Sequence, residues 1–171
     1  KDRNDVVFAF VGDGTKKQEL ETYVMEHKLD NVKFIPYQDK SDLIYSLNAG
    51  DIHWVVNAKG IKGVSVPSKL YGVMAAGKTV FGVLEEGSEA RLIIKDCKCG
   101  VCVEPGKYDL IHEELRKVID NINEYKKIGI KGKEYVDKFI KKDVAIEKYS
   151  REILCEDKKI TDVNYRKRIS I

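Results

Sequence analysis

Short apolar runs alternate with amphipathic stretches along the chain. Each run is rich in β-branched or aromatic residues and ends at glycine, proline or a polar residue, which is typical of buried parallel strands. The runs lie at 6–11, 32–35, 51–56, 79–83 and 100–103. Between and after them, apolar residues recur at helical spacing. This alternation predicts a layered α/β domain with a parallel sheet, whose functional residues lie at the carboxyl ends of the strands.

The stretch 62–83 contains a loop, a short helix and the fourth strand. Small polar residues crowd the loop, and Pro67 stands where a first helical turn begins. The start of such a helix offers unpaired N–H groups, and here it is accompanied by the hydroxyls of Ser65 and Ser68 and the ammonium of Lys69. These groups bind phosphate well. The pattern therefore predicts a phosphate site at this loop and helix.

Three other loops follow predicted strands. Gly12-Asp13-Gly14 is interpreted as a turn, because Lys17 stands where a dinucleotide fingerprint has its third glycine. Tyr37, just past the second strand, either stacks on a base or covers the sheet edge. Glu89, in the polar loop 85–89, is either a helix-dipole partner or a ligand residue, because that loop faces the expected crevice.

Composition narrows the class of protein. The chain has 171 residues, a net charge of +3 and no basic and aromatic motif of the kind that binds nucleic acid. Its apolar runs are too short to span a bilayer, and no signal-peptide pattern opens it. We expect a domain over 1–155, a polar tail over 156–171 that is frayed or touches an acidic membrane surface, and a cytoplasmic location.

Three of the four cysteines, Cys97, Cys99 and Cys102, lie within six residues of one another. The spacing C-x-C-x-x-C lacks a second matching pair, so a zinc site would need Cys155 or His112 as its fourth ligand. Small buried thiols in an apolar strand are the simpler interpretation. We expect no metal and no cofactor.

Several segments together resemble the donor-binding half of GT-B-type glycosyltransferases, closest to the retaining enzymes of bacterial and archaeal surface-polysaccharide synthesis. The resemblance covers residues 6–153. It rests on Phe10-Val11-Gly12-Asp13-Gly14, Val32-Lys33-Phe34-Ile35-Pro36, Pro67-Ser68-Lys69-Leu70-Tyr71-Gly72-Val73-Met74-Ala75-Ala76-Gly77-Lys78, Gly87-Ser88-Glu89-Ala90 and Cys99-Gly100-Val101-Cys102-Val103-Glu104-Pro105-Gly106.

The resemblance implies a Rossmann-like domain that helps to hold a nucleotide-diphosphate sugar between two such halves. The base would lie near Pro36 and Tyr37. The ribose and phosphates would lie near the site at Ser65, Pro67, Ser68 and Lys69, and the loop with Glu89 would approach the phosphates or the sugar. The sugar would pass, without a metal, to a polysaccharide or lipid-linked acceptor. No catalytic residue is assigned.

The sequence departs from this family in two ways. Many relatives carry a Glu-x7-Glu pair, and the aligned positions here are Val64 and Gly72. Relatives also have an acceptor domain, then a first strand and helix of the donor half, before the segment that resembles this chain. We therefore expect this chain alone to be inactive and to self-associate through an open sheet edge, with peripheral membrane association of the enzyme at the inner face.

Two alternatives remain open. One is a nucleotide-sugar 2-epimerase of the same architecture, which would eliminate and re-add the nucleotide with acids and bases. The other is a non-catalytic fragment that binds nucleotide weakly or not at all. Fold analogy alone does not choose among them.

Overall fold

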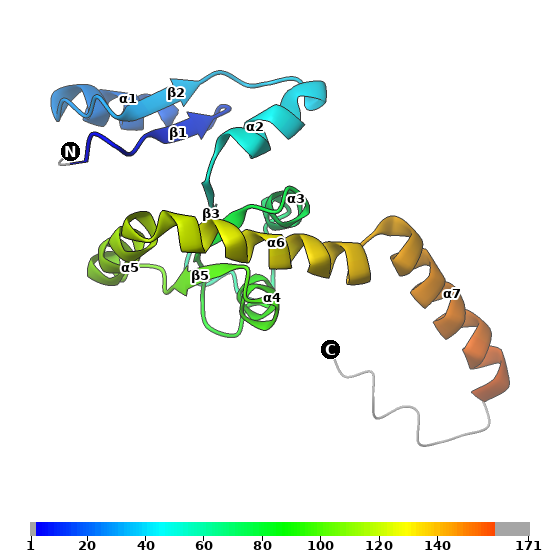
Figure 1. Cartoon of the computed structure of the whole chain (residues 1–171). Coiled ribbons are helices and arrows are strands. Elements are labelled where there is room, and N and C mark those ends of the chain that lie inside the picture. Colours follow the sequence, from blue (N-terminus) through cyan, green and yellow to red (C-terminus); the bar gives the residue numbers. More distant parts are fainter. Residues whose placement is uncertain (1–2, 160–171) are drawn as a thin grey trace.

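The computed structural model of the chain describes residues 3–159, in which strands and helices alternate before three consecutive helices close the fold (Figure 1). The elements are β1 Phe8–Val11, α1 Lys17–Glu26, β2 Val32–Ile35, η1 Lys40–Asp42, α2 Leu43–Ala49, β3 Ile52–Val56, α3 Lys69–Ala75, β4 Thr79–Val83, α4 Glu89–Cys97, β5 Gly100–Val103, α5 Tyr108–Asp120, α6 Ile122–Phe139 and α7 Lys142–Lys159.

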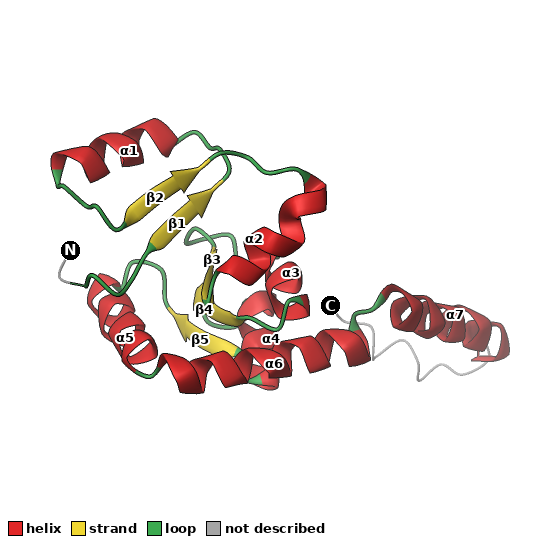
Figure 2. Cartoon of the chain, turned by 45° about the horizontal axis from the view of Figure 1, so that its top comes forward, coloured by secondary structure: helices red, strands yellow, loops and turns green. Residues whose placement is uncertain are grey.

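The strands form two parallel sheets, β1–β2 and β3–β4–β5 (Figure 2). Parallel strands flanked by helices confirm the predicted α/β class. The sheet is in two parts, because no strand among the described residues hydrogen-bonds to the free edges of β1 and β3. Self-association through such an edge stays a prediction.

The core lies on the two faces of the three-stranded sheet. Side chains alternate along β4, so Val80 joins the cluster formed with α3 and α4, while Phe81 and Val83 join the cluster formed with β5 and α5. All of β4 is buried. The ring of Trp54 packs against Phe81 with centroids 4.7 Å apart. This buried sheet is the rigid support for the loops at its edge.

Two glycines let α6 lie close against the start of β4 and against α3. A Cβ at Gly129 would stand 2.5 Å from the carbonyl oxygen of Gly77, and a Cβ at Gly132 would stand 3.1 Å from the Cβ of Cys99. The Thr79 hydroxyl donates a hydrogen bond to the carbonyl of Tyr125. The helix therefore packs against backbone, where any larger residue would collide.

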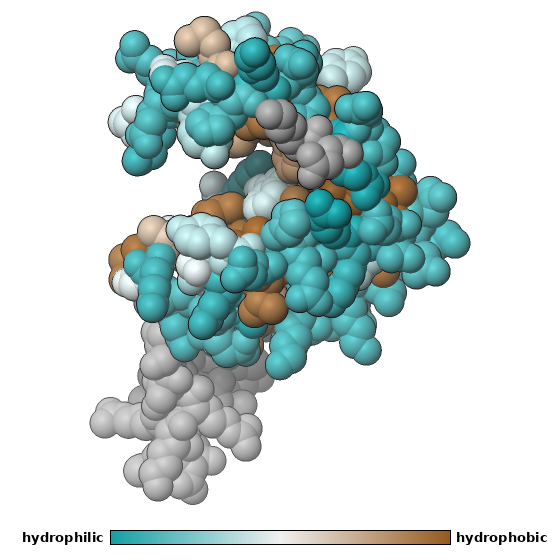
Figure 3. Space-filling view, turned by 90° about the vertical axis from the view of Figure 1, so that its left-hand side faces the viewer, coloured by the Kyte–Doolittle hydropathy of each residue, from teal (hydrophilic) through white to brown (hydrophobic). Residues whose placement is uncertain are grey.

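The β1–α1–β2 unit is poorly covered. Phe10 and Val11 are each 48% exposed, and α1 buries no residue. Figure 3 shows a hollow between this upper part and the rest of the molecule. The prediction of a buried strand at 6–11 is therefore wrong, because two strands offer too little surface to cover it, and Leu20 of α1 is 39% exposed for the same reason.

Helix α7 projects from the end of α6 (Figure 1). It continues to Lys159, so the predicted tail begins within a helix, and residues 160–171 lie outside the described part of the chain. Within the described residues, none of the helices combines the length and the apolar character needed to cross a membrane.

Candidate functional site

Helix α3 has the orientation that its sequence predicts, although it begins at Lys69, two residues after Pro67. Its apolar face, formed by Leu70, Val73 and Met74, is fully buried. The carbonyl of Pro67 accepts a hydrogen bond from the Leu70 amide at 3.0 Å, which makes a tight turn before the helix. The buried face therefore fixes the direction of the helix and turns the Lys69 side outward.

Polar groups at the start of α3 are unpaired. The hydroxyls of Ser65 and Ser68 and the ammonium of Lys69 make no hydrogen bond or ion pair with any described residue. Partial loss of solvent around the ammonium lowers the pKa of Lys69, because desolvation penalises its charged form, although the residue as a whole stays exposed. A bound anion would relieve that penalty.

The carboxylate of Glu85 braces the loop that leads to α3. One of its oxygens accepts hydrogen bonds from the backbone N–H groups of Gly60, at 2.9 Å, and Lys62, at 3.1 Å. The side chain of Asn57 donates to the carbonyl of Ser65 at 3.3 Å, which ties the other end of the loop to the end of β3. Sequence reasoning placed loop 85–89 near the ligand but missed this brace. Only the fold brings Glu85 to those amides.

Other acids of this edge are also paired. Arg91 forms ion pairs with Glu86 at 2.6 Å and Glu104 at 3.0 Å, and it donates to the carbonyl of Leu84. Glu104 also accepts from the amide of Glu86. Because these carboxylates are engaged, none of them pairs with Lys69.

The remaining predicted site residues lie apart from this group. Glu89 is exposed at the first position of α4, and its neighbour Ser88 donates its hydroxyl to the carbonyl of Glu85 rather than capping the helix. Tyr37 is 74% exposed, and Pro36 has its carbonyl bound by Gln38. None of the described contacts links Tyr37 to the start of α3. Among the predicted site residues, those at the start of α3 are therefore the sequence neighbours Ser65, Pro67, Ser68 and Lys69.

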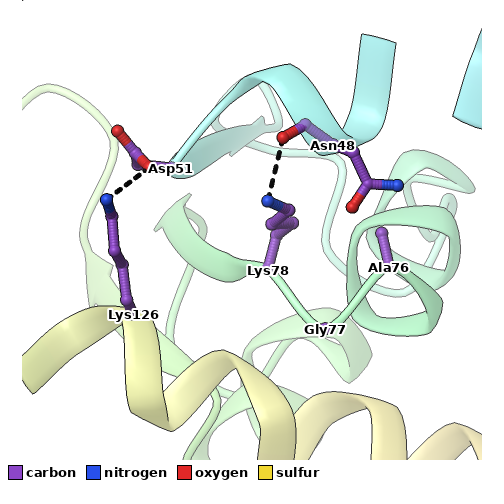
Figure 4. A pocket seen from close by; sticks show the side chains of 6 residues that line it. All are labelled: Asn48, Asp51, Ala76, Gly77, Lys78 and Lys126. Atoms are coloured by element: carbon purple, nitrogen blue, oxygen red, sulfur yellow. Dashed lines mark hydrogen bonds and ion pairs between the residues drawn. The ribbon is translucent and has the colours of Figure 1, made fainter. Parts of the chain in front are cut away.

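A cavity of about 210 Å³ lies at the opposite, amino-terminal ends of β3 and β4 (Figure 4). It is lined by Asn48, Asp51, Ala76, Gly77, Lys78 and Lys126. Its cations are satisfied internally, because Lys78 donates to the carbonyl of Asn48 at 2.9 Å and Lys126 pairs with Asp51 at 2.8 Å. The polar residues that line this cavity therefore connect the ends of α2, β3, β4 and α6 to one another, and their cations are not available to a ligand.

The cysteines lie against the core. Cys99 is fully buried, while Cys97 and Cys102 are partly buried beside the same cluster. No group of three side chains among the described residues is placed to hold a metal ion.

We predict that the purified protein carries no stoichiometric zinc. Elemental analysis, followed by circular dichroism with and without a chelator, measures this. One zinc per chain whose removal unfolds the protein would contradict the prediction.

Comparisons with known proteins agree with this fold. The chain is 27% identical over 149 residues to the putative colanic acid biosynthesis glycosyl transferase WcaI of Escherichia coli K12, covering 86% of this chain and 36% of that protein. It is 31% identical over 93 residues to the probable glycosyltransferase WbjE of Pseudomonas aeruginosa, covering 54% of this chain and 23% of that protein. The chain thus spans about a third or less of these relatives.

A solved structure, Anabaena Alr3699/HepE in complex with UDP-glucose, superposes with a TM-score of 0.66 at 19% identity, covering 86% of this chain and 42% of that one. Fold and neighbours define a Rossmann-like α/β domain of the GT-B type. The family model described as glycosyl transferases group 1 matches residues 1–135, and the chain belongs to that family.

Proposed function

We propose that this chain binds the nucleoside diphosphate part of a nucleotide-sugar donor in a glycosyltransferase. The observation that carries the proposal is the ammonium of Lys69 at the start of α3, which, like the hydroxyls of Ser65 and Ser68, pairs with no described residue, while Glu85, Glu86 and Glu104 of the same edge are engaged elsewhere. Family membership supports the reaction class, and the UDP-glucose complex of a structural neighbour supports the ligand class.

The charge of the leaving diphosphate would be stabilised by Lys69 and by the first N–H groups of α3, without a metal. The two positions that align with the Glu-x7-Glu pair are occupied by Val64 and Gly72. Val64 is 81% exposed, and a Cβ added at Gly72 would stand 3.6 Å from the Leu47 side chain. Neither position supplies a carboxylate, so the ribose contact comes from another part of the protein. The Pro-Ser-Lys block at 67–69 would then be the phosphate-binding motif of this chain.

Further parts of the proposal concern the rest of the donor and the acceptor. The base would stack near Pro36 and Tyr37, and Glu89 would approach the phosphates or the sugar from the start of α4. Colanic acid biosynthesis in the name of one relative supports a polysaccharide as the product to which the sugar is added. A lipid-linked acceptor and a peripheral membrane location remain part of the proposal. The acceptor would be held by a part of the enzyme that corresponds to the portion of the relatives not spanned by this chain.

Replacing Lys69 with alanine is expected to weaken nucleoside diphosphate binding by about 10- to 150-fold. One charge-assisted contact contributes roughly 1.5–3 kcal/mol, which corresponds to that factor. Calorimetric titration of the chain with each common nucleoside diphosphate measures the effect.

Lys127→Ala is the matched control, because Lys127 is an exposed lysine on α6, away from the loop edge. It should bind like the unaltered chain. Equal affinity of the Lys69→Ala and Lys127→Ala variants would remove Lys69 from the site, and no binding of any diphosphate by the unaltered chain would remove the site itself.

A further inference from the structure

Two thiols meet at the junction of α4 and β5, away from the donor site. Cys97 is the last residue of α4, and Cys99 directly precedes β5. Lys98, between them, adopts the left-handed conformation with φ of 53° and ψ of 41°, which is uncommon for a residue other than glycine. This sharp reversal folds Cys99 back toward the turn that carries Cys97.

The carbonyl of Ile94 marks the point at which the two residues converge. It accepts a hydrogen bond from the Cys99 amide at 3.3 Å and a weaker one from the Cys97 thiol, whose sulfur is 3.8 Å away. Each of these two thiols perturbs the pKa of the other more than any other group does, which places the two side chains next to each other. Residues two apart span at most about 7 Å, and disulfides join Cα atoms that are about 4.4–6.8 Å apart.

The environments of the two thiols differ. Cys97 is partly exposed, and the neighbouring Cys99 thiol lowers its pKa, which favours the thiolate. Cys99 is fully buried, and the neighbouring Cys97 thiol, together with burial, raises its pKa. The thiolate is the nucleophile, so Cys97 would react first with an oxidant. Cys99 would then be the resolving thiol that closes the disulfide.

We propose that Cys97 and Cys99 form a reversible, peroxide-sensitive dithiol site. The Cys97 thiolate attacks one oxygen of a hydroperoxide, the O–O bond breaks, and a sulfenic acid and hydroxide (or alkoxide) form. The Cys99 sulfur, losing its proton, attacks the sulfenic sulfur; the S–S bond forms, the S–O bond breaks and water leaves. Two thiols give up two electrons and two protons, and the peroxide is reduced.

Cys102 serves as an internal control, because it is close in sequence and its thiol lies against the neighbouring strand β4. Its sulfur lies 2.8 Å from where a Cβ on Gly82 would stand, on the neighbouring strand. Burial raises its pKa to about 11, so it stays a thiol at neutral pH. It should remain reduced when Cys97 and Cys99 are linked.

The test treats the full chain with hydrogen peroxide at neutral pH, alkylates the remaining thiols and digests with trypsin. We expect peptides 96–98 and 99–107 joined by one disulfide, or an uncut peptide 96–107 lighter by two hydrogens, with Cys102 alkylated. The linked species should disappear after dithiothreitol and in the Cys97→Ser variant, and it should persist in Cys102→Ala.

Three results would overturn the proposal. These are alkylated Cys97 after peroxide treatment, loss of the linked species in Cys102→Ala, and a bond from Cys97 to another chain. Cys97 is the residue changed in the main variant because it is partly exposed, whereas truncating the buried Cys99 would also disturb the core. Circular dichroism of Cys97→Ser should match that of the unaltered chain.

Discussion

Alanine in place of Gly129 is expected to destabilise the folded protein strongly. Its Cβ would stand 2.5 Å from the oxygen of Gly77, 2.6 Å from the carbonyl carbon of Lys78 and 2.7 Å from the nitrogen of Thr79. All three are backbone atoms, which cannot turn aside like the end of a side chain. Helix α6 would have to move away from β4, the most buried strand of the core.

The expected cost is at least about 3 kcal/mol, at the upper end of the range for overpacking, against a typical total stability of about 5–15 kcal/mol. Urea unfolding followed by circular dichroism measures it. Helix propensity alone would favour alanine by about 1 kcal/mol, so the sign of the change separates the two effects.

Gly14→Ala is the matched control, because a Cβ there meets nothing within 4 Å and the backbone has no positive φ. It should change the free energy of unfolding by no more than about 0.5 kcal/mol. An unfolding midpoint for Gly129→Ala equal to that of Gly14→Ala would show that α6 is not held against β4 as described.

A polypeptide of these 171 residues, assayed by itself, is expected to transfer no sugar. Positioning of two reactants accounts for about 7–11 kcal/mol of barrier lowering in enzymes. The chain spans 36% of WcaI and 42% of the UDP-glucose-bound neighbour, and the groups at the start of α3 are suited to one phosphate-bearing partner. Without a second site to orient the acceptor hydroxyl, binding of the donor is not converted into transfer.

The measurement is incubation with a panel of radiolabelled nucleotide sugars and with simple or lipid-linked sugar acceptors. Counts should equal those of the buffer control. Turnover above buffer that the Lys69→Ala substitution abolishes and the Lys127→Ala substitution preserves would show that this polypeptide is a complete enzyme. Joining the chain to the segments that its relatives carry beyond it is expected to restore transfer.

Local patterns in the sequence were sufficient for the α/β class and for the inner face of α3. Runs such as 79–83 are short, apolar and β-branched, and they are strands because such side chains pack well on a pleated surface. Leu70, Val73 and Met74 share a face by helical spacing, and all three are buried. Motif resemblance added the family, which the match over residues 1–135 confirms.

The hydrophobic pattern of β1 predicted a buried strand, but β1 is largely exposed and α1 buries no residue. An apolar run states what a strand can bury, whereas actual burial depends on which neighbours lie against it. Phe10 and Val11 remain about half exposed, because their sheet has only two strands among the described residues. Hydrophobic periodicity contains no information about the absence of such a neighbour.

The sequence by itself placed the candidate phosphate-binding residues next to one another, because Ser65, Pro67, Ser68 and Lys69 are close in the chain at or just before the start of α3. Only the tertiary structure decided that Glu85 holds the loop before α3, that Arg91 engages Glu86 and Glu104, and that none of these acids pairs with Lys69. These contacts join separate loops, and a pairing between distant residues forms only when the sheet brings its strand ends together.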